Sequence, residues 1–347
     1  MTGVFLLLAL TAAAPSPSPV PFRLTAVAPV EGKAPEWDYL TWDAARNRLF
    51  IGRRDDGLAV FDPAAKRIVA TVADTTGAGA ATLIPSLDRG FSVNEDGSTT
   101  IFTLSTLRPV KRLKIADDAD SAVYEPVTAQ LLFLSGDSKR ISFVDPASLT
   151  VRGTLATASA KLEASAADGT GRVFIAERDR NAILVVDART RSIAAEWPVA
   201  GCAQPTGLAF DPGGHRLYVG CRGEHPVLAV VDAASGTGIA TTDLGRGNDG
   251  VIWDAVSGRV FAANGVDANI VVYRATADGA TLDHAFTTRP GARTIAYDPA
   301  HGTLFSVTAA GIVDPTRPVN RGPSPFYPNR FIDDSFVVLT FQQPSNP

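Results

Sequence analysis

The sequence predicts an all-β fold, a seven-bladed β-propeller with four antiparallel strands in each blade. The main observation is an aromatic position that recurs along the chain, at Phe50, Phe91, Phe133, Phe174, Tyr218, Phe261 and Phe305. Successive spacings are 41, 42, 41, 44, 43 and 44 residues, and so regular a period indicates one structural unit repeated seven times. The 30 glycines and 24 prolines among 347 residues also favour many short strands joined by turns.

The same elements follow one another in each repeat. An apolar strand ends in an acid seven residues before the aromatic, at Asp43, Asp211, Asp254 and Asp298. The aromatic lies in a second strand, and a third strand ends 12 to 14 residues after it, at Asp62, Asp145, Asp187 and Asp232. A turn and a more variable fourth strand follow, as in residues 67–72. Four strands in 41–44 residues match a propeller blade, and we interpret the acids as turn residues that accept backbone N–H groups.

The two ends of the chain predict how the ring closes. The seventh repeat, from Ala292 onward, ends before a fourth strand, whereas an extra strand, Phe22 to Val30, precedes the first repeat. This N-terminal strand can become the outer strand of the last blade and cover an otherwise open edge. We therefore expect one propeller domain over residues 22–341, followed by a C-terminal tail at 342–347.

The first residues have the pattern of a signal peptide. An apolar run from Val4 to Ala14 ends in small residues, and a Pro/Ser stretch follows at 15–21. The run is too short to span a bilayer comfortably. We predict a signal peptide at 1–14, a leader at 15–21, and export to the periplasm or the extracellular space. A retained anchor and a misassigned start are the alternatives.

The two cysteines, Cys202 and Cys221, lie in or beside one predicted hairpin. A disulfide between them is geometrically plausible, and an oxidising compartment would favour it. Two unrelated buried thiols are the alternative.

We expect chemistry on the face where the loops entering the innermost strands meet the loops between the second and third strands. The residues predicted to bind a ligand on this channel face are Trp37, Asp38, Asp120, Glu163, Arg222, Asn248, Asp249 and Arg293. Arg53, Arg178 and Arg222 either recognise an anion there or form a solvated rim. The unusually long loop at 309–334 is either a binding element or a disordered segment, with Phe326 and Tyr327 best able to contact a partner.

Three repeats carry related tetrads, which are Phe91 to Asn94, Phe174 to Glu177 and Phe261 to Asn264. Together with residues 173–187, these tetrads resemble the YVTN repeat of the YncE-like seven-bladed propellers, although the literal tetrad never occurs. The resemblance covers residues 22–341. It implies an exported propeller from a group that mostly lacks assigned enzymatic activity, and related propellers include lactonases and quinoprotein dehydrogenase subunits.

Carboxylates at the channel mouth leave a metal site as an alternative. The candidate ligands are Glu36, Asp38, Glu163, Asn248 and Asp249. Their oxygen atoms could hold one calcium-like divalent cation that polarises water, as a metal-dependent lactonase-like hydrolase would require. The acids could instead be solvated and paired with Arg246 and Arg293, because their spacing is not diagnostic of a metal site.

Other chemistries are disfavoured. Residues 245–250 fit the letters G-x-G-x-x-G, but a strand follows where a dinucleotide site needs a helix. A net charge of −4 and a pI near 5.6 argue against a nucleic-acid surface. A quinoprotein-type redox subunit lacks a cofactor-ligand pattern. We predict an exported, non-enzymatic, monomeric scaffold without a cofactor that binds a protein, glycan or small ligand on its channel face.

Overall fold

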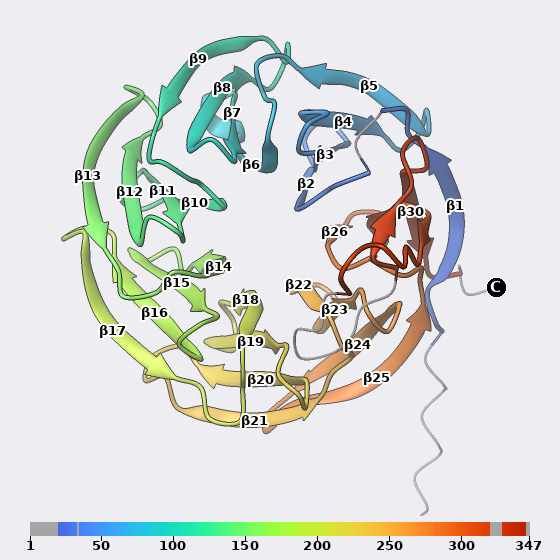
Figure 1. The fold of residues 1–347 in the computed structure, drawn as a ribbon. Coiled ribbons are helices and arrows are strands. Elements are labelled where there is room, and N and C mark those ends of the chain that lie inside the picture. Colours follow the sequence, from blue (N-terminus) through green and yellow to red (C-terminus); the bar gives the residue numbers. More distant parts are fainter. Residues whose placement is uncertain (1–19, 33–34, 320–327, 345–347) are drawn as a thin grey trace, which may run out of the picture.

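The computed structural model describes residues 20–32, 35–319 and 328–344. Its strands form seven four-stranded antiparallel sheets arranged radially around a central channel (Figure 1), which confirms the predicted all-β propeller. Within these ranges the one helical element is a single 3-10 turn, η1 (Pro85–Leu87), and no helix is long and apolar enough to cross a membrane. The predicted signal peptide and most of the leader lie outside the described residues.

Six blades each use four consecutive strands, from the channel outward. Blade 1 contains β2 (Leu40–Asp43), β3 (Arg48–Gly52), β4 (Leu58–Asp62) and β5 (Arg67–Val72). Blade 2 contains β6 (Ala78–Ile84), β7 (Arg89–Asn94), β8 (Ser98–Thr103) and β9 (Pro109–Lys114). Blade 3 contains β10 (Ser121–Glu125), β11 (Gln130–Ser135), β12 (Arg140–Asp145) and β13 (Thr150–Ala156).

The remaining blades follow the same plan until the last. Blade 4 contains β14 (Leu162–Ala167), β15 (Arg172–Glu177), β16 (Ala182–Asp187) and β17 (Ser192–Pro198). Blade 5 contains β18 (Pro205–Asp211), β19 (Arg216–Cys221), β20 (Val227–Asp232) and β21 (Gly238–Asp243). Blade 6 contains β22 (Asn248–Asp254), β23 (Arg259–Asn264), β24 (Asn269–Thr276) and β25 (Gly279–Thr287).

Blade 7 is built from both ends of the chain. Its strands, from the channel outward, are β26 (Ile295–Asp298), β27 (Thr303–Thr308), β30 (Val337–Gln342) and β1 (Arg23–Pro29). β1 pairs antiparallel with β30, from Arg23 opposite Gln342 to Pro29 opposite Val337 (Figure 1). The N-terminal strand therefore closes the ring as the outer strand of the last blade. The long loop between β27 and β30 contains a two-residue hairpin pair, β28 (Gly311–Ile312) and β29 (Arg330–Phe331).

The acids that end the strands act as turn residues, as predicted. Asp62 Oδ1 accepts hydrogen bonds from the backbone N–H groups of Ala64 and Ala65 at 2.9 and 3.1 Å. Asp187 Oδ1 does the same for Arg189 and Thr190 at 2.7 and 3.1 Å. Because the carboxylates satisfy turn N–H groups on the face away from the channel mouth, they are occupied by the fold itself.

Neighbouring blades are joined by stacked aromatic side chains. The recurring aromatic of the second strand is buried, and in four blades it packs against an aromatic on the innermost strand of the next blade. These pairs and their ring-centroid distances are Phe174–Phe210 (5.8 Å), Tyr218–Trp253 (5.4 Å), Phe261–Tyr297 (5.0 Å) and Phe305–Trp42 (5.3 Å). The last pair joins blade 7 to blade 1. Each such contact stabilises by about 0.5–1.5 kcal/mol beyond the apolar area it buries.

A disulfide joins Cys202, just before blade 5, to Cys221 at the end of β19, with the two Cα atoms 5.3 Å apart. Both residues are buried in the apolar cluster between blades 4 and 5. The bond closes a loop with a sequence separation of 19 residues, for which chain-entropy models give about 3 kcal/mol of stabilisation. It fixes the segment that enters blade 5 from the channel face.

Deleting residues 22–30 should lower the melting temperature by at least about 10 °C, because it exposes the edge of β30 and removes the packing of Phe22 on Phe261. Differential scanning calorimetry measures this directly. The control is Leu24→Thr with Val27→Thr, which changes two exposed side chains and keeps the strand. An unchanged transition in the deletion variant would contradict closure by β1.

Candidate ligand site at the channel mouth

Each blade contributes one equivalent position where the chain enters its innermost strand. These positions, which we call the mouth ring, are Asp38, Gly79, Asp120, Glu163, Thr206, Asp249 and Arg293, spaced by 41, 41, 43, 43, 43 and 44 residues. In blades 2, 4, 5 and 6 the position lies in a register shift of the ladder, as at Asp249 between Asn248 and Gly250. A bulge of this kind takes a residue out of the ladder and re-aims its side chain.

Asp38 is held by an arginine from its own blade. Its Oδ2 atom lies 2.5 Å from an NH group of Arg54, whose second NH group lies 2.7 Å from Glu95 Oε1. A Cβ atom at Gly79 would lie 3.0 Å from Arg54 and 3.1 Å from Asp38. The glycine at the blade 2 position of the mouth ring therefore leaves the space that this ion pair occupies.

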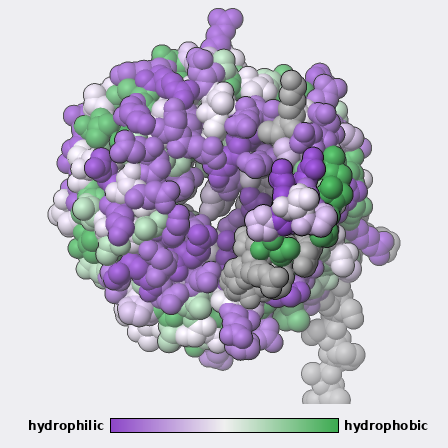
Figure 2. Space-filling view, viewed as in Figure 1, coloured by the Kyte–Doolittle hydropathy of each residue, from purple (hydrophilic) through white to green (hydrophobic). Residues whose placement is uncertain are grey.

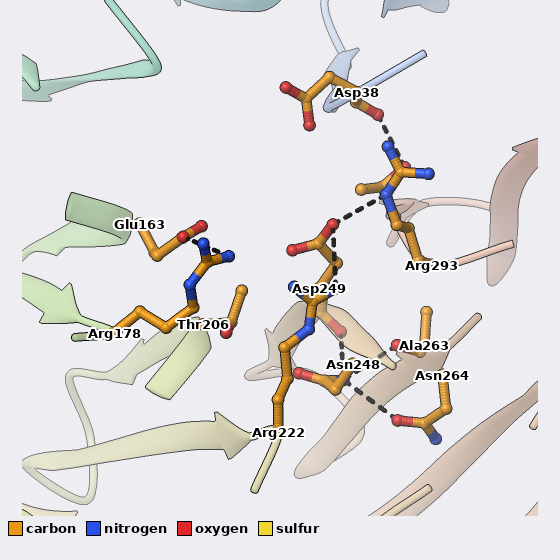
Figure 3. A network of polar contacts seen from close by, with 12 residues as sticks. Asp38, Glu163, Arg178, Thr206, Arg222, Asn248, Asp249, Ala263, Asn264 and Arg293 are labelled. Carbon is orange, nitrogen blue, oxygen red and sulfur yellow. Dashed lines mark hydrogen bonds and ion pairs between the residues drawn. The ribbon is translucent and has the colours of Figure 1, made fainter. Parts of the chain in front are cut away.

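Asp249 lies between two arginines, as Figure 3 shows. Arg293 Nε lies 2.9 Å from Asp249 Oδ2, and an NH group of Arg293 donates to the carbonyl oxygen of Trp37 at 2.7 Å. The guanidinium also lies 5.0 Å from the centre of the Trp37 ring. Arg222 approaches the same Asp249 oxygen only to 3.6 Å. Arg293 is therefore firmly oriented by blades 6 and 1, whereas Arg222 is held loosely.

Glu163 forms an ion pair with Arg178 at 2.8 Å. In the neighbouring blade 3, Asp120 accepts a hydrogen bond from the backbone N–H of Gly136 at 3.0 Å. Acidic side chains of the mouth are thus paired with arginines, as Glu95 is with Arg54 and Glu163 is with Arg178. Figure 3 shows Glu163 and Arg178 facing each other.

Burial makes two carboxyl groups of the mouth ring, those of Asp38 and Glu163, weaker acids than usual. The side chains of Asp38, Glu163 and Asp249 are only 14%, 16% and 11% exposed. Burial raises the pKa of Asp38 to about 7, although Arg54 and Arg293 oppose the shift. Burial, followed by the charge of Asp249, likewise raises the pKa of Glu163 to about 7. Raised carboxyl pKa values of this kind lower the free energy of unfolding at neutral pH. They are found most often at functional sites.

A cavity of about 590 Å³ lies next to the mouth ring, inside the channel. Its apolar lining comes from the innermost strands and includes Leu40, Ala80, Ala122, Ala164, Leu208 and Val251. Figure 2 shows mainly hydrophilic residues around the central opening. The entrance is therefore charged and the interior largely apolar, a combination common in ligand pockets of about 300–1,000 Å³.

The structure places the sequence candidates in different surroundings. Asp38, Asp120, Glu163, Asp249 and Arg293 belong to the mouth ring, and Arg222 lies beside it. Trp37 is 2% exposed, and its ring centroid lies 4.8 and 5.7 Å from those of Phe331 and Phe336. It therefore helps to position Arg293 and does not line the channel surface. Phe326 and Tyr327 lie outside the described residues.

Two other candidates are buried for structural reasons. Asn248 is fully buried, and its Nδ2 donates to Ala263 O at 3.0 Å and Asn264 Oδ1 at 3.3 Å. Arg53 is 1% exposed, with its guanidinium 4.1 Å from the centre of the Phe336 ring and 2.7 Å from Asp56. It fastens blade 1 to the end of the long loop, so it is placed for stability and not for an anion in the channel.

The candidate metal ligands face other groups in this structure. Asp38, Glu163 and Asp249 each face a guanidinium, and Glu36 is exposed. Within the described ranges, no three or more His, Cys, Asp or Glu side chains are grouped so that they could hold a metal ion.

Sequence reasoning passed over Gly79, Thr206 and Glu95. The repeat spacing of 41 to 44 residues contains the signal for Gly79 and Thr206, since it fixes one mouth position in every blade. Glu95 follows β7 directly, at the place that Arg54 takes in blade 1. No local motif marks it, because its partner comes from the neighbouring blade.

Another buried acid lies at the end of β15. Glu177 is 0% exposed, and neither of its oxygen atoms has a hydrogen-bond partner among the described residues. Arg180 Nε is 3.8 Å away. Burial raises the pKa of Glu177 to about 7. The equivalent positions, three residues after the recurring aromatic, carry an arginine in blade 1 and uncharged residues in five other blades, namely Arg53, Asn94, Gly136, Cys221, Asn264 and Thr308.

Comparisons with known proteins identify the fold alone. No family model and no curated protein matches the chain. The WD40 repeats of RRP9 superpose with a TM-score of 0.73 at 10% identity, covering 93% of this chain and 100% of that one. A chain of the mitotic checkpoint complex gives 0.70 at 16% identity, covering 87% and 95%. A chain of Kuenenia stuttgartiensis hydrazine synthase gives 0.68 at 12% identity, covering 80% and 94%.

Glu177→Gln should stabilise the protein above about pH 7 by up to about 3 kcal/mol, since its pKa rises from 4.5 to about 7 and one pKa unit corresponds to about 1.4 kcal/mol. The folded-state pKa lies above the ordinary glutamate value of 4.5, so the folded state binds more protons. Stability is therefore highest below the unfolded pKa and falls as the pH rises through the folded value. Urea unfolding at several pH values measures this.

The matched control is Glu224→Gln, because Glu224 is exposed. It should unfold like the wild-type protein throughout the pH series. A Glu177→Gln variant whose stability follows the wild-type pH profile would contradict a charge-dependent cost at this site.

Proposed function

We propose that this protein is an exported, non-enzymatic propeller that binds a ligand at the mouth ring. The observation that carries the proposal is the set of half-buried charges at the entrance of an apolar cavity. The fold does not need charge there, because Gly79 and Thr206 fill the equivalent positions in blades 2 and 5. Burying ion pairs is a poor route to stability, so a binding role accounts for them better.

The ion pairs at the mouth favour binding over catalysis. Asp38, Glu163 and Asp249 are each tied to an arginine, which leaves them suited to orienting a ligand and less suited to abstracting a proton. The resemblance to YncE-like propellers supports the same reading. Export is supported by the apolar N-terminal run and by the Cys202–Cys221 disulfide, which persists in oxidising compartments.

Immobilised protein should retain a ligand from an envelope extract of the source organism, and the combined variant Arg54→Gln, Arg178→Gln, Arg222→Gln should lose it. These changes remove three guanidiniums of the mouth and nothing on the outer strands. Mass spectrometry of eluted proteins, glycans and small molecules provides the readout. Thermal melting and the single variant Arg222→Gln separate lost binding from lost folding.

The matched control carries Arg23→Gln, Arg67→Gln and Arg108→Gln, three exposed arginines away from the mouth. It should retain the same material as the wild type. Equal retention by the mouth variant would place the binding surface elsewhere and refute the proposal.

A metal-dependent hydrolase would differ in its response to calcium. We expect purified protein to show no stoichiometric metal by elemental analysis, and its melting temperature to change by less than about 1 °C in millimolar calcium, because a bound cation would stabilise by mass action. A stoichiometric metal together with a calcium-dependent rise in melting temperature would favour the hydrolase.

A further inference from the structure

The arginines at the mouth differ in how many of their guanidinium N–H groups have a partner. Arginine has five N–H donors in a planar fork. Arg293 uses Nε and one NH group, and Arg54 uses both of its NH groups. Arg222 makes no side-chain hydrogen bond within the described chain, and its Nε is buried without a partner. Its one ion pair, to Asp249, is 3.6 Å long.

Asp249 cannot complete the coordination of Arg222. The oxygen that Arg222 approaches is Oδ2, which already accepts from Arg293 Nε at 2.9 Å. A buried donor left unmatched costs about 1–3 kcal/mol. Arg222 therefore has N–H donors that Asp249 does not satisfy and that a second oxyanion could accept.

A second arginine lies in the neighbouring blade. Arg178 follows β15 as Arg222 follows β19, and Figure 3 shows Thr206 between the two side chains. An NH group of Arg178 lies 2.8 Å from Glu163 Oε1. The two side chains are 30% and 22% exposed, so an incoming ligand can reach both. Planar carboxylates pair with such forks through two parallel hydrogen bonds.

The channel cavity, which is lined in part by Asp249, the residue that Arg222 approaches, suits an apolar group. In blades 4, 5 and 6 it is lined by Ala164, Leu208 and Val251. A ligand whose charged end lay at Arg178 and Arg222 would extend along this wall. Removing its apolar surface from water would contribute about 25 cal/mol per Å².

We propose that the mouth binds an organic carboxylate with an apolar body, the carboxylate held by Arg222 and Arg178 and the body in the channel cavity. The inference rests on the proposed function, for which it names the ligand class. Glu163 lies among Arg178, Arg222, Asp120 and Asp249, and burial raises its pKa to about 7. Proton uptake by Glu163 would offset the charge of the arriving carboxylate, so binding should tighten as the pH falls through neutrality.

Isothermal titration of the full chain with octanoate, octylammonium and 1-octanol tests the ligand class, because the three probes share a chain and differ in charge. We expect saturable one-to-one binding of octanoate and at least about tenfold weaker binding of the other two. Octanol binding as tightly as octanoate would refute the oxyanion site, and tighter binding of octylammonium would assign the mouth to cations. No binding of octanoate would also overturn the inference.

Arg222→Gln and Arg178→Gln should each weaken octanoate binding by about tenfold, the usual effect of losing a charged hydrogen bond. Arg222→Lys should give an intermediate loss, since it keeps the charge without the fork. Arg246→Gln is the control, because Asp267 already engages the guanidinium of Arg246, and this variant should bind as the wild type does. Full affinity in Arg222→Gln would overturn the inference.

The two proposals fail in different ways. If octanoate does not bind but the mouth still retains a ligand from the extract, the carboxylate inference fails. The proposed function then stands, with a ligand of another chemical class. Retention that no longer depends on the mouth arginines would remove the proposed function, whatever the probes do.

Discussion

The structure depends on the packing of each sheet against two neighbours. A four-stranded blade has two largely apolar faces, and its middle strands are buried on both, as in β15 and β16. No blade can cover those faces alone, so only a closed ring removes them all from water. The contact between Phe305 of blade 7 and Trp42 of blade 1 completes the ring, and β1 protects its last edge.

Closure also builds the mouth. Trp37 and Arg293 are separated by almost the whole domain in sequence, yet the ring brings them together so that the carbonyl oxygen and the indole of Trp37 hold the guanidinium. Arg54 reaches from blade 1 to Glu95 of blade 2 in the same way. The charges at the mouth are therefore linked across blade boundaries, and their positions are as fixed as the packing beneath them.

Burial of acidic side chains has two distinct consequences in this protein. At the mouth, Asp38 and Glu163 are compensated by arginines, and their surroundings are polar on one side and apolar on the other. Glu177 lies away from that network, at a position where five of the other blades place uncharged residues. The first arrangement concentrates polarity where a ligand can enter, whereas the second only makes folding dependent on protonation.

The sequence by itself determined the seven blades, their strand order, the turn acids such as Asp62 and the closing role of residues 22–30. Those features follow from a local pattern that repeats in register, so each copy reinforces the interpretation of the next. Only the tertiary structure decided which mouth residues meet and which are buried. Asn248 and Asp249 are adjacent in the chain, but a register shift turns one into the sheet and the other toward Arg293. Side-chain direction at a bulge, and the neighbour supplied by the next blade, are not encoded in spacing.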